Sequence, residues 1–283
     1  MLRVPLSAGD GLTALAALVG ALLIQIGTNF ANDYYDAVKG TDTEDREGFT
    51  RVTAGGLIEP RQVKRAMLGT YGLAVLVGVY LVYLGGVPIV VVGLSSIVAG
   101  VLYTGGPYPY GYYGLGDFFV FLYFGVVAVT GTYYVQAVTE VGGAFPLWLP
   151  PGTLSVAVVV ASLGAAGLST AILVVNNIRD LESDAAAGKR TLAVMLGYRW
   201  SRVEFLALVA LSYIAPVVLW AGFDYPWTTL LPLFSLPNAV PLSRTVLSRT
   251  DGEALNPALE QTGKLFGVYA LLFAGGLVAP GVV

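Results

Sequence analysis

The sequence contains no cysteine and no histidine among its 283 residues, and it carries few charges of either sign. This chain therefore has no disulfide, no thiolate or imidazole ligand for zinc or haem, no thiol nucleophile and no Ser-His-Asp triad. A metal ion bound to it must be held by oxygen atoms, which favours hard cations such as Mg²⁺, Mn²⁺ or Ca²⁺.

Charged residues make up only 12% of the chain, whereas soluble domains carry about a quarter. Hydrophobic residues reach 56% and the mean hydropathy is +0.73, so the composition indicates an integral membrane protein with several spans. The 15 Lys and Arg face 18 Asp and Glu, and no stretch is typical of a nucleic-acid-binding patch. We expect a lipid bilayer around the chain, and no segment indicates an obligate protein partner.

Eight apolar runs each approach the roughly 20 residues that a helix needs to span a bilayer. They predict an all-α fold, a polytopic transmembrane helix bundle with eight spans in a single domain over 1–283. Gly85, Gly86 and Pro88 predict a tight turn between the second and third runs, and four prolines predict a kinked or broken seventh run. The runs are 12–34, 66–86, 87–104, 117–138, 153–176, 203–222, 226–247 and 264–282.

The basic residues are unevenly distributed over the predicted connections between spans. With eight spans, 14 of the 15 Lys and Arg fall on one face of the membrane, and only Arg3 falls on the other. The positive-inside rule assigns the basic face to the cytoplasm. We therefore predict a multi-pass protein of the cytoplasmic cell membrane, with cytoplasmic loops at 32–64 and 176–202.

Two acidic stretches follow directly on long apolar runs and open on the predicted cytoplasmic face. Residues three and four positions apart share one face of a helix, so each stretch forms a stripe of amide and carboxylate oxygens. Carboxylates are costly in a bilayer, which makes both stripes candidates for function. The first comprises Asn29, Asn32, Asp33 and Asp36, and the second comprises Asn176, Asn177, Asp180 and Asp184.

We predict that the two stripes face each other at helix ends and hold one or two Mg²⁺ ions. Proteins bind Mg²⁺ through a few carboxylates, while waters and substrate phosphates complete its shell. Acidic residues, a metal ion and basic residues at the same membrane surface are suited to bind a diphosphate group. The adjoining basic residues are Lys39, Arg46 and Arg51 after the first stripe, and Arg179, Lys189 and Arg190 around the second.

A connection rich in glycine and tyrosine, residues 103–117, lies on the same predicted face. It either covers the site or forms a tight turn with tyrosines at the membrane interface. Asp117, at its end, begins a helix after a glycine-rich turn, and we interpret it as a cap or a membrane-edge residue. Tyr133, Tyr134 and Gln136 end the fourth run on the opposite face, and we interpret them as interfacial or helix-packing residues.

Two segments, NDYYDAVKGTD at 32–42 and NNIRDLESDAAAGKRTLAVMLG at 176–197, resemble the two aspartate-rich motifs of the UbiA-type intramembrane prenyltransferases. The similarity extends through YTGGPYPYGYYGLGD at 103–117, GTYYVQ at 131–136 and LNPALEQTGKL at 255–265. It therefore covers nearly the whole chain. Both motifs, in this order and on the same predicted face of a multi-span chain, make a specific resemblance.

Within this family, RVTAGGLI after the first motif is close to the form of the 1,4-dihydroxy-2-naphthoate polyprenyltransferases of menaquinone synthesis. The 4-hydroxybenzoate and archaeal geranylgeranylglyceryl phosphate branches usually show Asn-Arg-Pro-x-Arg-Pro there, and this chain lacks that element. The resemblance implies Mg²⁺-dependent transfer, with Mn²⁺ as an alternative ion, of a polyprenyl group from polyprenyl diphosphate to an aromatic acceptor. In the naphthoate branch CO₂ is lost and demethylmenaquinone results.

The resemblance also implies roles for individual residues. Metal ligands are expected at Asn32, Asp33, Asp36, Asp180 and Asp184, and the four aspartates are expected to be essential for catalysis. Tyr103 is expected near the reacting carbon, where an aromatic face can stabilise an allylic cation. Substrate binding is expected from Asn29, Lys39, Arg51, Asn177, Arg179, Lys189 and Arg190.

One feature departs from the family pattern. Family members have nine transmembrane helices, and their first aspartate motif ends the second helix, whereas here the motif ends the first apolar run. We therefore expect the counterpart of the opening helix to be missing. A start site placed too late, a trimmed chain or a true eight-span protein would each account for this.

Several other functions stay open from the sequence. Prenyl transfer to 4-hydroxybenzoate or to geranylgeranylglyceryl phosphate would change only the acceptor. A membrane cation transporter would also place carboxylates in the bilayer, although the neighbouring Arg and Lys would repel cations. An intramembrane aspartyl protease would use short motifs of the kind seen at Tyr35-Asp36 and at 114–117.

Overall fold

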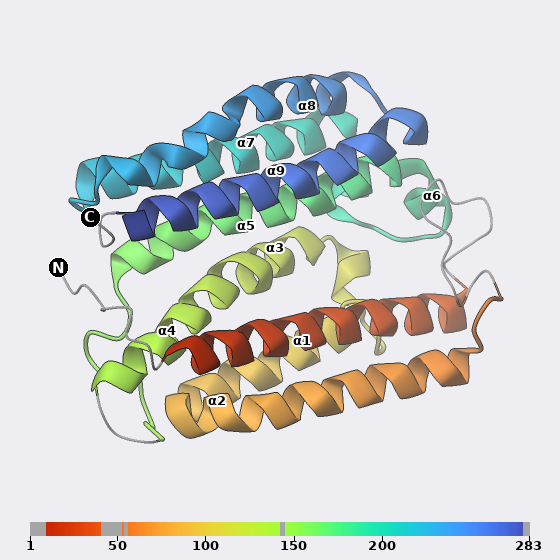
Figure 1. The fold of residues 1–283 in the computed structure, drawn as a ribbon. Coiled ribbons are helices and arrows are strands. Elements are labelled where there is room, and N and C mark those ends of the chain that lie inside the picture. Colours follow the sequence, from red (N-terminus) through yellow and green to blue (C-terminus); the bar gives the residue numbers. More distant parts are fainter. Residues whose placement is uncertain (1–9, 41–52, 54–55, 142–144, 280–283) are drawn as a thin grey trace. The chain divides into compact units, whose positions relative to one another are not determined.

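The computed structural model describes residues 10–40, 53, 56–141 and 145–279, and within these ranges the chain is helical and contains no β-strand (Figure 1). The predicted all-α fold is therefore confirmed. By its contacts the chain forms two compact units. The first comprises 1–45, 49–112 and 130–155, and the second comprises 46–48, 113–129 and 156–283. The single domain over 1–283 stays a prediction.

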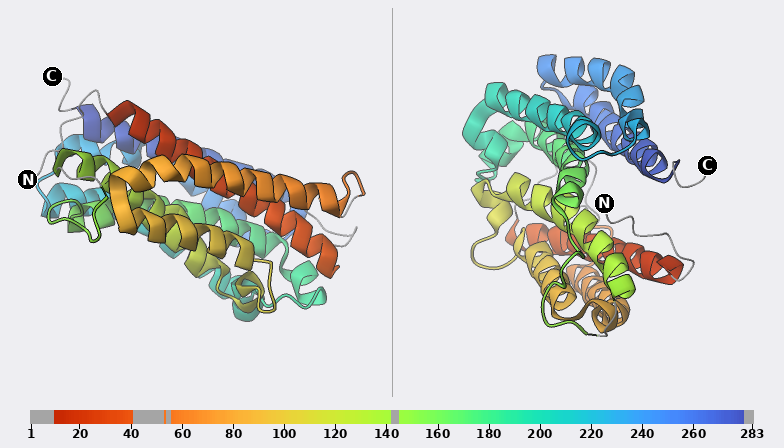
Figure 2. Two further views of the ribbon diagram at one scale, coloured as in Figure 1. Left: turned by 90° about the horizontal axis from the view of Figure 1, so that it is seen from below. Right: turned by 90° about the vertical axis from the view of Figure 1, so that its left-hand side faces the viewer.

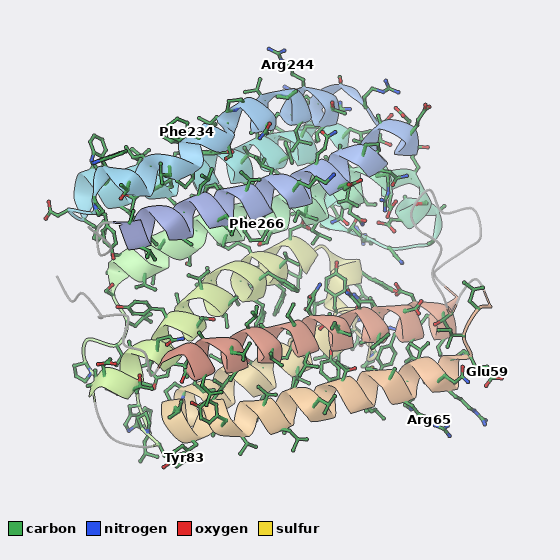
Figure 3. All side chains as sticks on the ribbon, in the orientation of Figure 1. Glu59, Arg65, Tyr83, Phe234, Arg244 and Phe266 are labelled. Carbon is green, nitrogen blue, oxygen red and sulfur yellow. The ribbon has the colours of Figure 1, made fainter. Side chains whose placement is uncertain are left out.

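The first unit is built on α1 (Asp10–Lys39), α2 (Pro60–Leu102) and most of α4 (Ala128–Val141). Pro60 begins α2, where its missing N–H costs nothing because the first helical N–H groups have no partner in the helix. Figure 3 shows Glu59 and Arg65 at one end of the first half of α2 and Tyr83 at the other. This half helix thus has a charged end and an aromatic end, as expected for a membrane span.

The chain reverses direction within α2, at the turn that the sequence predicts. Gly86 has a non-helical backbone with φ 61° and ψ −149°, so α2 consists of two helical halves. A Cβ on Gly86 would collide with the backbone of Pro146, whose carbonyl oxygen accepts a hydrogen bond of 3.0 Å from the Val87 N–H. Only glycine fits this left-handed conformation under a covering loop.

Tyr71 forms the centre of the contact between α1 and the two halves of α2. It belongs to a buried cluster with Ala31 and Met67, and its hydroxyl lies 3.2 Å from Thr28 Oγ1. A Cβ on Gly27 would come within 2.8 Å of the Tyr71 ring, and one on Gly100 would crowd Thr28 and the Tyr71 hydroxyl. Small residues at such positions allow membrane helices to approach closely.

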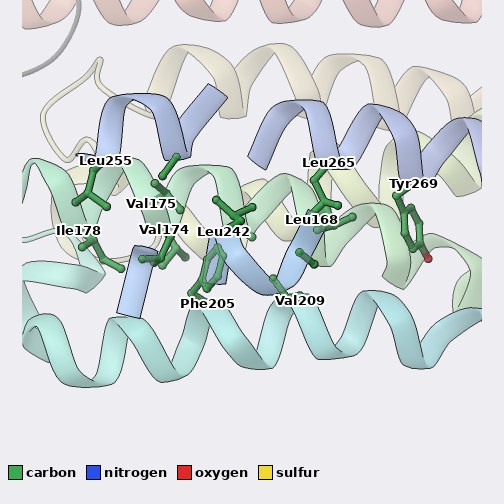
Figure 4. Close-up of a cluster of buried hydrophobic side chains, with 14 of the residues drawn as sticks. Leu168, Val174, Val175, Ile178, Phe205, Val209, Leu242, Leu255, Leu265 and Tyr269 are labelled. Atoms are coloured by element: carbon green, nitrogen blue, oxygen red, sulfur yellow. The ribbon is translucent and has the colours of Figure 1, made fainter. Parts of the chain in front are cut away.

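The second unit is organised around α5 (Val156–Arg179), which contacts α7 (Leu192–Gly222), α9 (Gly252–Val278) and η2 (Phe121–Val127). Its core joins α5, α7, α8 (Leu236–Ser248) and α9, and Figure 4 shows Leu168, Phe205 and Leu242 within it. The remaining elements are α3 (Gly116–Val120), α6 (Leu181–Ala186) and η3 (Trp227–Ser235), and η1 (Tyr110–Tyr113) lies at the junction of the two units' sequence ranges.

The helix that starts with α3 contains a π-helical segment, η2, before it continues as α4. Gly125 in η2 is buried, and a Cβ there would collide with the backbone and side chain of Ala166 on α5. Widened π-helical turns are rare and frequently occur at functional sites. The close packing at Gly125 fixes this turn against α5.

Six described helices are long and apolar enough to cross a membrane. The chain is therefore a multi-pass membrane protein, whose helices Figure 2 shows from two further directions. The predicted break in the proline-rich run is confirmed, because it consists of the 3₁₀ segment η3 followed by α8. The count of eight spans stays a prediction. The six helices are 11–39, 60–102, 116–141, 156–179, 192–222 and 252–278.

Candidate functional site

The first aspartate motif occupies the last turns of α1 in the first unit. Asp33 and Asp36 are buried, with exposed fractions of 5% and 3%, and Asn32 is half-buried beside them. Asn29, which begins the stripe, and Lys39, which follows it, are exposed. The predicted helical stripe is thus formed, with its two carboxylates turned into the protein.

Asp33 has one bonded and one free carboxylate oxygen. Thr53 Oγ1 donates a hydrogen bond of 2.7 Å to Oδ2, while Oδ1 is buried and has no hydrogen-bond partner in the described part of the chain. A buried acceptor without a partner costs about 1–3 kcal/mol and more when charged. An oxygen left free in this way is available to a cation. Thr53 lies in the stretch RVTAGG, and the sequence did not identify it as a site residue.

The glycine- and tyrosine-rich connection lies against this motif. Thr104 Oγ1 donates to Asn32 Oδ1 at 3.1 Å, and the Tyr112 hydroxyl donates a short hydrogen bond to Asp36 Oδ1. Lys39 Nζ donates to the Thr104 and Gly106 carbonyls at 2.6 and 3.1 Å. Of the two alternatives left open by the sequence, these contacts favour a segment that covers the motif.

Tyr103, predicted to lie near the reacting carbon, begins this covering segment. Its ring is half-buried and meets the ring of Tyr110 edge-on, with centroids 5.4 Å apart. The backbone of Gly111 passes close by, since its N–H donates to the Tyr103 carbonyl at 3.0 Å. The catalytic role of Tyr103 stays a prediction.

The second aspartate motif lies where α5 ends in the second unit. Arg179 Nε and Nη2 donate to the two carboxylate oxygens of Asp180 at 2.7 and 2.8 Å, and both side chains are almost fully buried. Nη2 also donates to Asn176 Oδ1 at 2.8 Å. Arg179, which we predicted to bind substrate, is thus tied to Asp180, and the metal and substrate roles of the pair stay predictions.

Asn256, on α9, completes this network and was missed by the sequence interpretation. Its Oδ1 accepts a hydrogen bond of 2.8 Å from Arg179 Nη1. The two residues are 77 positions apart, so no local pattern could have paired them. Asn256 lies in the segment LNPALEQTGKL, which resembles the family. That resemblance did not assign a role to any residue of the segment.

The remaining predicted residues of the second motif lie around α6. Asn177 and Lys189 are buried, Asp184 is half-buried and Arg190 is exposed. The backbone N–H of Asp184 donates to the Asp180 carbonyl at 2.8 Å, and that of Lys189 donates to the Asp184 carbonyl at 2.9 Å. This short turn brings Lys189 back to the acidic residues. Arg51, also predicted to bind substrate, lies outside the described residues, as does Arg46.

The interpretation of Asp117 as a helix cap is wrong, whereas its place at the membrane edge stays a prediction. Leu115 is the residue that precedes the first turn of α3, and no side chain makes a capping hydrogen bond there. Asp117 is the second residue of α3, is 4% exposed, and has an Oδ2 atom without a hydrogen-bond partner among the described residues. The glycine-rich turn predicted a helix start correctly, but burial depends on packing that the local sequence does not reveal.

Among the residues that the structure describes, no group of three or more acidic side chains gathers around one point. The predicted Mg²⁺ ligands nevertheless fit a hard cation chemically, since all are oxygen donors and Asp33 offers a buried oxygen without a partner. The metal ligand set stays a prediction.

Comparison with known sequences identifies similarity over nearly the whole chain. The chain is 39% identical over 266 residues to 1,4-dihydroxy-2-naphthoate octaprenyltransferase of Mycobacterium tuberculosis, covering 93% of this chain and 84% of that protein. It is 38% identical over 279 residues to the Escherichia coli protein of the same name, with coverages of 95% and 84%. Human UbiA prenyltransferase domain-containing protein 1 is 30% identical over 265 residues, with coverages of 92% and 71%.

Two solved structures share the fold. One, from work on digeranylgeranylglyceryl phosphate synthase in membranes, aligns with a TM-score of 0.58 at 14% identity, covering 94% of this chain and 93% of that one. A UbiA homologue from Archaeoglobus fulgidus, bound to DMAPP and Mg²⁺, aligns with a TM-score of 0.55 at 12% identity, with coverages of 93% and 88%.

The model of the UbiA prenyltransferase family matches residues 4–277. The resemblance carried by the two aspartate motifs is therefore confirmed. Relatives named as prenyltransferases cover almost the same residues. The chain belongs to the UbiA prenyltransferase family and is a membrane-spanning enzyme that transfers prenyl groups.

Proposed function

We propose that this enzyme transfers a polyprenyl group from a polyprenyl diphosphate to 1,4-dihydroxy-2-naphthoate, with loss of CO₂, to give demethylmenaquinone. One observation carries the choice of acceptor. Five bacterial proteins named 1,4-dihydroxy-2-naphthoate octaprenyltransferase match 93–95% of this chain at 29–39% identity. A prenyl diphosphate as donor is supported by the Archaeoglobus homologue, which holds DMAPP and Mg²⁺.

Mg²⁺ is the cofactor we propose, held by Asn32, Asp33 and Asp36 from the first motif and by Asp180 and Asp184 from the second. The support is the free buried oxygen of Asp33, together with the preference of Mg²⁺ for carboxylate ligands and substrate phosphates. When bound, Mg²⁺ neutralises the negative charge that develops on the leaving diphosphate. Mn²⁺ offers the same oxygen-seeking chemistry as an alternative ion.

The hydrogen bonds around the first motif hold its acids ready for this task. Thr53 orients Asp33 and leaves Oδ1 free, while Tyr112 orients Asp36. Groups held in position before the reaction pay no reorganisation cost when charge develops. We propose that the basic and amide side chains around the motifs donate to the diphosphate oxygens; they are Asn29, Lys39, Arg51, Asn177, Arg179, Lys189 and Arg190.

Departure of the diphosphate breaks the bond between oxygen and the allylic carbon and leaves a delocalised cation. The ring of the acceptor attacks this carbon, and the bond to the acceptor carboxylate then breaks with release of CO₂. A cation of this kind is stabilised by aromatic faces. We propose that Tyr103 provides one of them, supported by its half-buried ring beside the covering segment.

We place the protein in the cytoplasmic membrane, with both aspartate motifs open to the cytoplasm. The support is the predicted clustering of 14 of the 15 basic residues on one face. This orientation gives the motifs access to a water-soluble naphthoate, while the polyprenyl tail stays among lipid.

The test is an assay with membranes that contain the full chain, a polyprenyl diphosphate and dihydroxynaphthoate. Prenylated naphthoquinol and CO₂ should form with Mg²⁺ and should cease when a chelator removes it. Asp36→Ala and Asp180→Ala should abolish turnover while the proteins stay in the membrane, and Asp224→Asn, at an exposed aspartate, should leave turnover unchanged. Prenylation of 4-hydroxybenzoate or geranylgeranylglyceryl phosphate in place of the naphthoate would refute the proposed acceptor.

A further inference from the structure

Asp117 is a buried acid that the proposed diphosphate site does not use. It is the second residue of a helix, 116–141, that is apolar and long enough to cross the membrane, and only 4% of it is exposed. Within the residues that the structure describes, its Oδ2 atom has no hydrogen-bond partner. Leaving a buried polar atom unpaired costs about 1–3 kcal/mol, and more for a charged group. Ionisable residues kept within membrane spans at such a cost usually serve function.

Asp117 lies in the first turn of α3, where the helix dipole favours a carboxylate, but its Oδ2 atom has no hydrogen-bond partner among the described residues. Leu115, and not Asp117, precedes the first turn of α3, and no side chain caps that end. The π-helical segment η2 follows only four residues later, at Phe121. One helix thus contains an unpaired acid and, within two turns of it, a π-helical segment. Both features are associated with functional sites.

The turn before Asp117 lies against the segment that follows the second aspartate motif, within the same unit. Gly114 has a left-handed backbone with φ 75°. A Cβ on Gly114 would come within 2.8 Å of Met195 Sδ and within 3.6 Å of the Arg190 carbonyl oxygen. The turn three residues before Asp117 therefore lies beside the backbone of Arg190, one of the residues proposed to bind the prenyl diphosphate.

The charge around Asp117 indicates what kind of ligand it can receive. Glu204, half-buried on α7, interacts electrostatically with Asp117. In the described part of the chain, neither carboxylate is paired with a basic side chain. A buried carboxylate oxygen without a partner is satisfied by a group that donates a hydrogen bond to it. A hydroxyl is such a group, and the acceptor of the proposed reaction carries two.

We propose that the Asp117 carboxylate binds a hydroxyl of the aromatic acceptor and serves as the base that takes its proton. This inference rests on the proposed function. The O–H bond of the acceptor breaks, its proton moves to Oδ2, and the electron pair left on oxygen drives the ring carbon onto the allylic carbon. The diphosphate leaves with the pair of the broken C–O bond.

The same proton completes the reaction. Loss of CO₂ returns the pair of the broken C–C bond to the ring, which regenerates an oxyanion at the original hydroxyl position. Asp117 then returns its proton to this oxygen, and the net products are the prenylated hydroquinone, CO₂ and diphosphate. Proton transfer by a positioned side chain contributes typically about 10²–10⁴-fold in rate.

The experiment compares wild-type enzyme with Asp117→Asn and Asp117→Glu in membranes. Asp117→Asn should lower kcat about 100-fold or more, whereas binding of the prenyl diphosphate with Mg²⁺ should change less than about twofold. Asp117→Glu, which keeps the carboxylate, should recover part of the activity. The matched control is Asp224→Asn at an exposed aspartate of the same unit, and it should behave as wild type.

A second readout separates a base from a residue that only supports the fold. Acceptors with more acidic hydroxyls, such as chlorinated dihydroxynaphthoates, need less help from a base, so they should restore turnover to Asp117→Asn far more than they accelerate wild type. Equal effects on both proteins, or turnover of Asp117→Asn within about threefold of wild type, would overturn the proposal. Parallel loss of prenyl diphosphate binding would overturn it too.

The outcome for wild type keeps this proposal distinct from the proposed function. If wild type prenylates a different hydroxyl-bearing acceptor, the naphthoate assignment fails, and the Asp117 comparison is made on the acceptor that is used. If wild type prenylates dihydroxynaphthoate and Asp117→Asn does so equally well, only the assignment of Asp117 fails.

Discussion

Arg179 holds both carboxylate oxygens of the adjacent Asp180, with Nε 2.7 Å from Oδ1 and Nη2 2.8 Å from Oδ2. A planar guanidinium matches a carboxylate in this two-point geometry, which lysine cannot reproduce. Both side chains are nearly inaccessible to solvent, with exposed fractions of 3% and 1%. The second aspartate motif therefore contains its own counter-charge.

Replacement of Arg179 by glutamine should destabilise the protein strongly. It leaves the buried Asp180 carboxylate without compensation, and removal of one partner from a buried pair costs roughly 3–5 kcal/mol. Addition of Asp180→Asn in the same chain removes the uncompensated charge and should recover much of the free energy of unfolding, although not the activity. Denaturation of the detergent-purified proteins measures both effects. A double variant no more stable than Arg179→Gln would contradict the charge explanation.

Asn256 should act on catalysis only through Arg179. Asn256→Ala removes the acceptor of the 2.8 Å bond from Nη1, a bond to a charged group worth about 1.5–3 kcal/mol. We expect turnover to fall about 5- to 50-fold, a range corresponding to part of that energy. Asn256→Asp keeps the oxygen acceptor and should retain most activity. Turnover in matched membrane preparations is the measurement.

The control for Asn256 is Asn238→Ala, which truncates an exposed asparagine on α8 in the same unit and should change little. Residues that act through one network show non-additive effects. In an Arg179→Gln background, Asn256→Ala should therefore have almost no further effect on stability. A fully additive loss would show that Asn256 acts by another route.

Thr53 should tune the response of the enzyme to Mg²⁺. Thr53→Val removes the 2.7 Å hydrogen bond that orients Asp33, whose other oxygen is already free. We expect the Mg²⁺ concentration for half-maximal activity to rise about 3- to 10-fold, because one lost hydrogen bond is worth about 1 kcal/mol. Activity at saturating Mg²⁺ should recover. Thr53→Ser keeps the hydroxyl and should need the same Mg²⁺ concentration for half-maximal activity as wild type. If Thr53→Val also needs the same Mg²⁺ concentration as wild type, Thr53 does not have this role.

The sequence predicts well those features that depend on neighbouring residues. Gly85, Gly86 and Pro88 mark the reversal in α2, and the prolines at 226–241 mark the break before α8. The acidic stripe on α1 follows from helical spacing alone. These features arise from backbone restrictions and from side-chain periodicity, which short segments carry by themselves.

Contacts between distant segments could not be predicted in this way. Thr53 reaches Asp33 over 20 positions, and Asn256 reaches Arg179 over 77, through packing that no local pattern specifies. Arg179 was expected to bind substrate because its charge suits a diphosphate, and the sequence did not show that it also binds the neighbouring Asp180. Asp117 was taken for a cap because it follows glycines, whereas the fold buries it.

Gly86 offers a test of the reversal in α2, with Gly197 on α7 as its matched control. Both have left-handed backbones that essentially only glycine adopts, with φ 61° and ψ −149° at Gly86 and φ 69° and ψ 171° at Gly197. The Cβ of an alanine at position 197 would have open space around it. Gly197→Ala should therefore lower the free energy of unfolding only through backbone strain, by about 1–3 kcal/mol. Gly86→Ala adds a collision with Pro146 and should lower the free energy of unfolding by clearly more than Gly197→Ala does.

The collision at Gly86 should also leave a local signature, because the Pro146 carbonyl that a Cβ would displace accepts a hydrogen bond from the Val87 N–H at 3.0 Å. Hydrogen exchange at Val87 should therefore accelerate in Gly86→Ala and stay unchanged in Gly197→Ala. If both variants lose the same stability and Val87 stays protected in both, backbone strain alone explains Gly86. The loop at 145–146 would then not hold the turn in place.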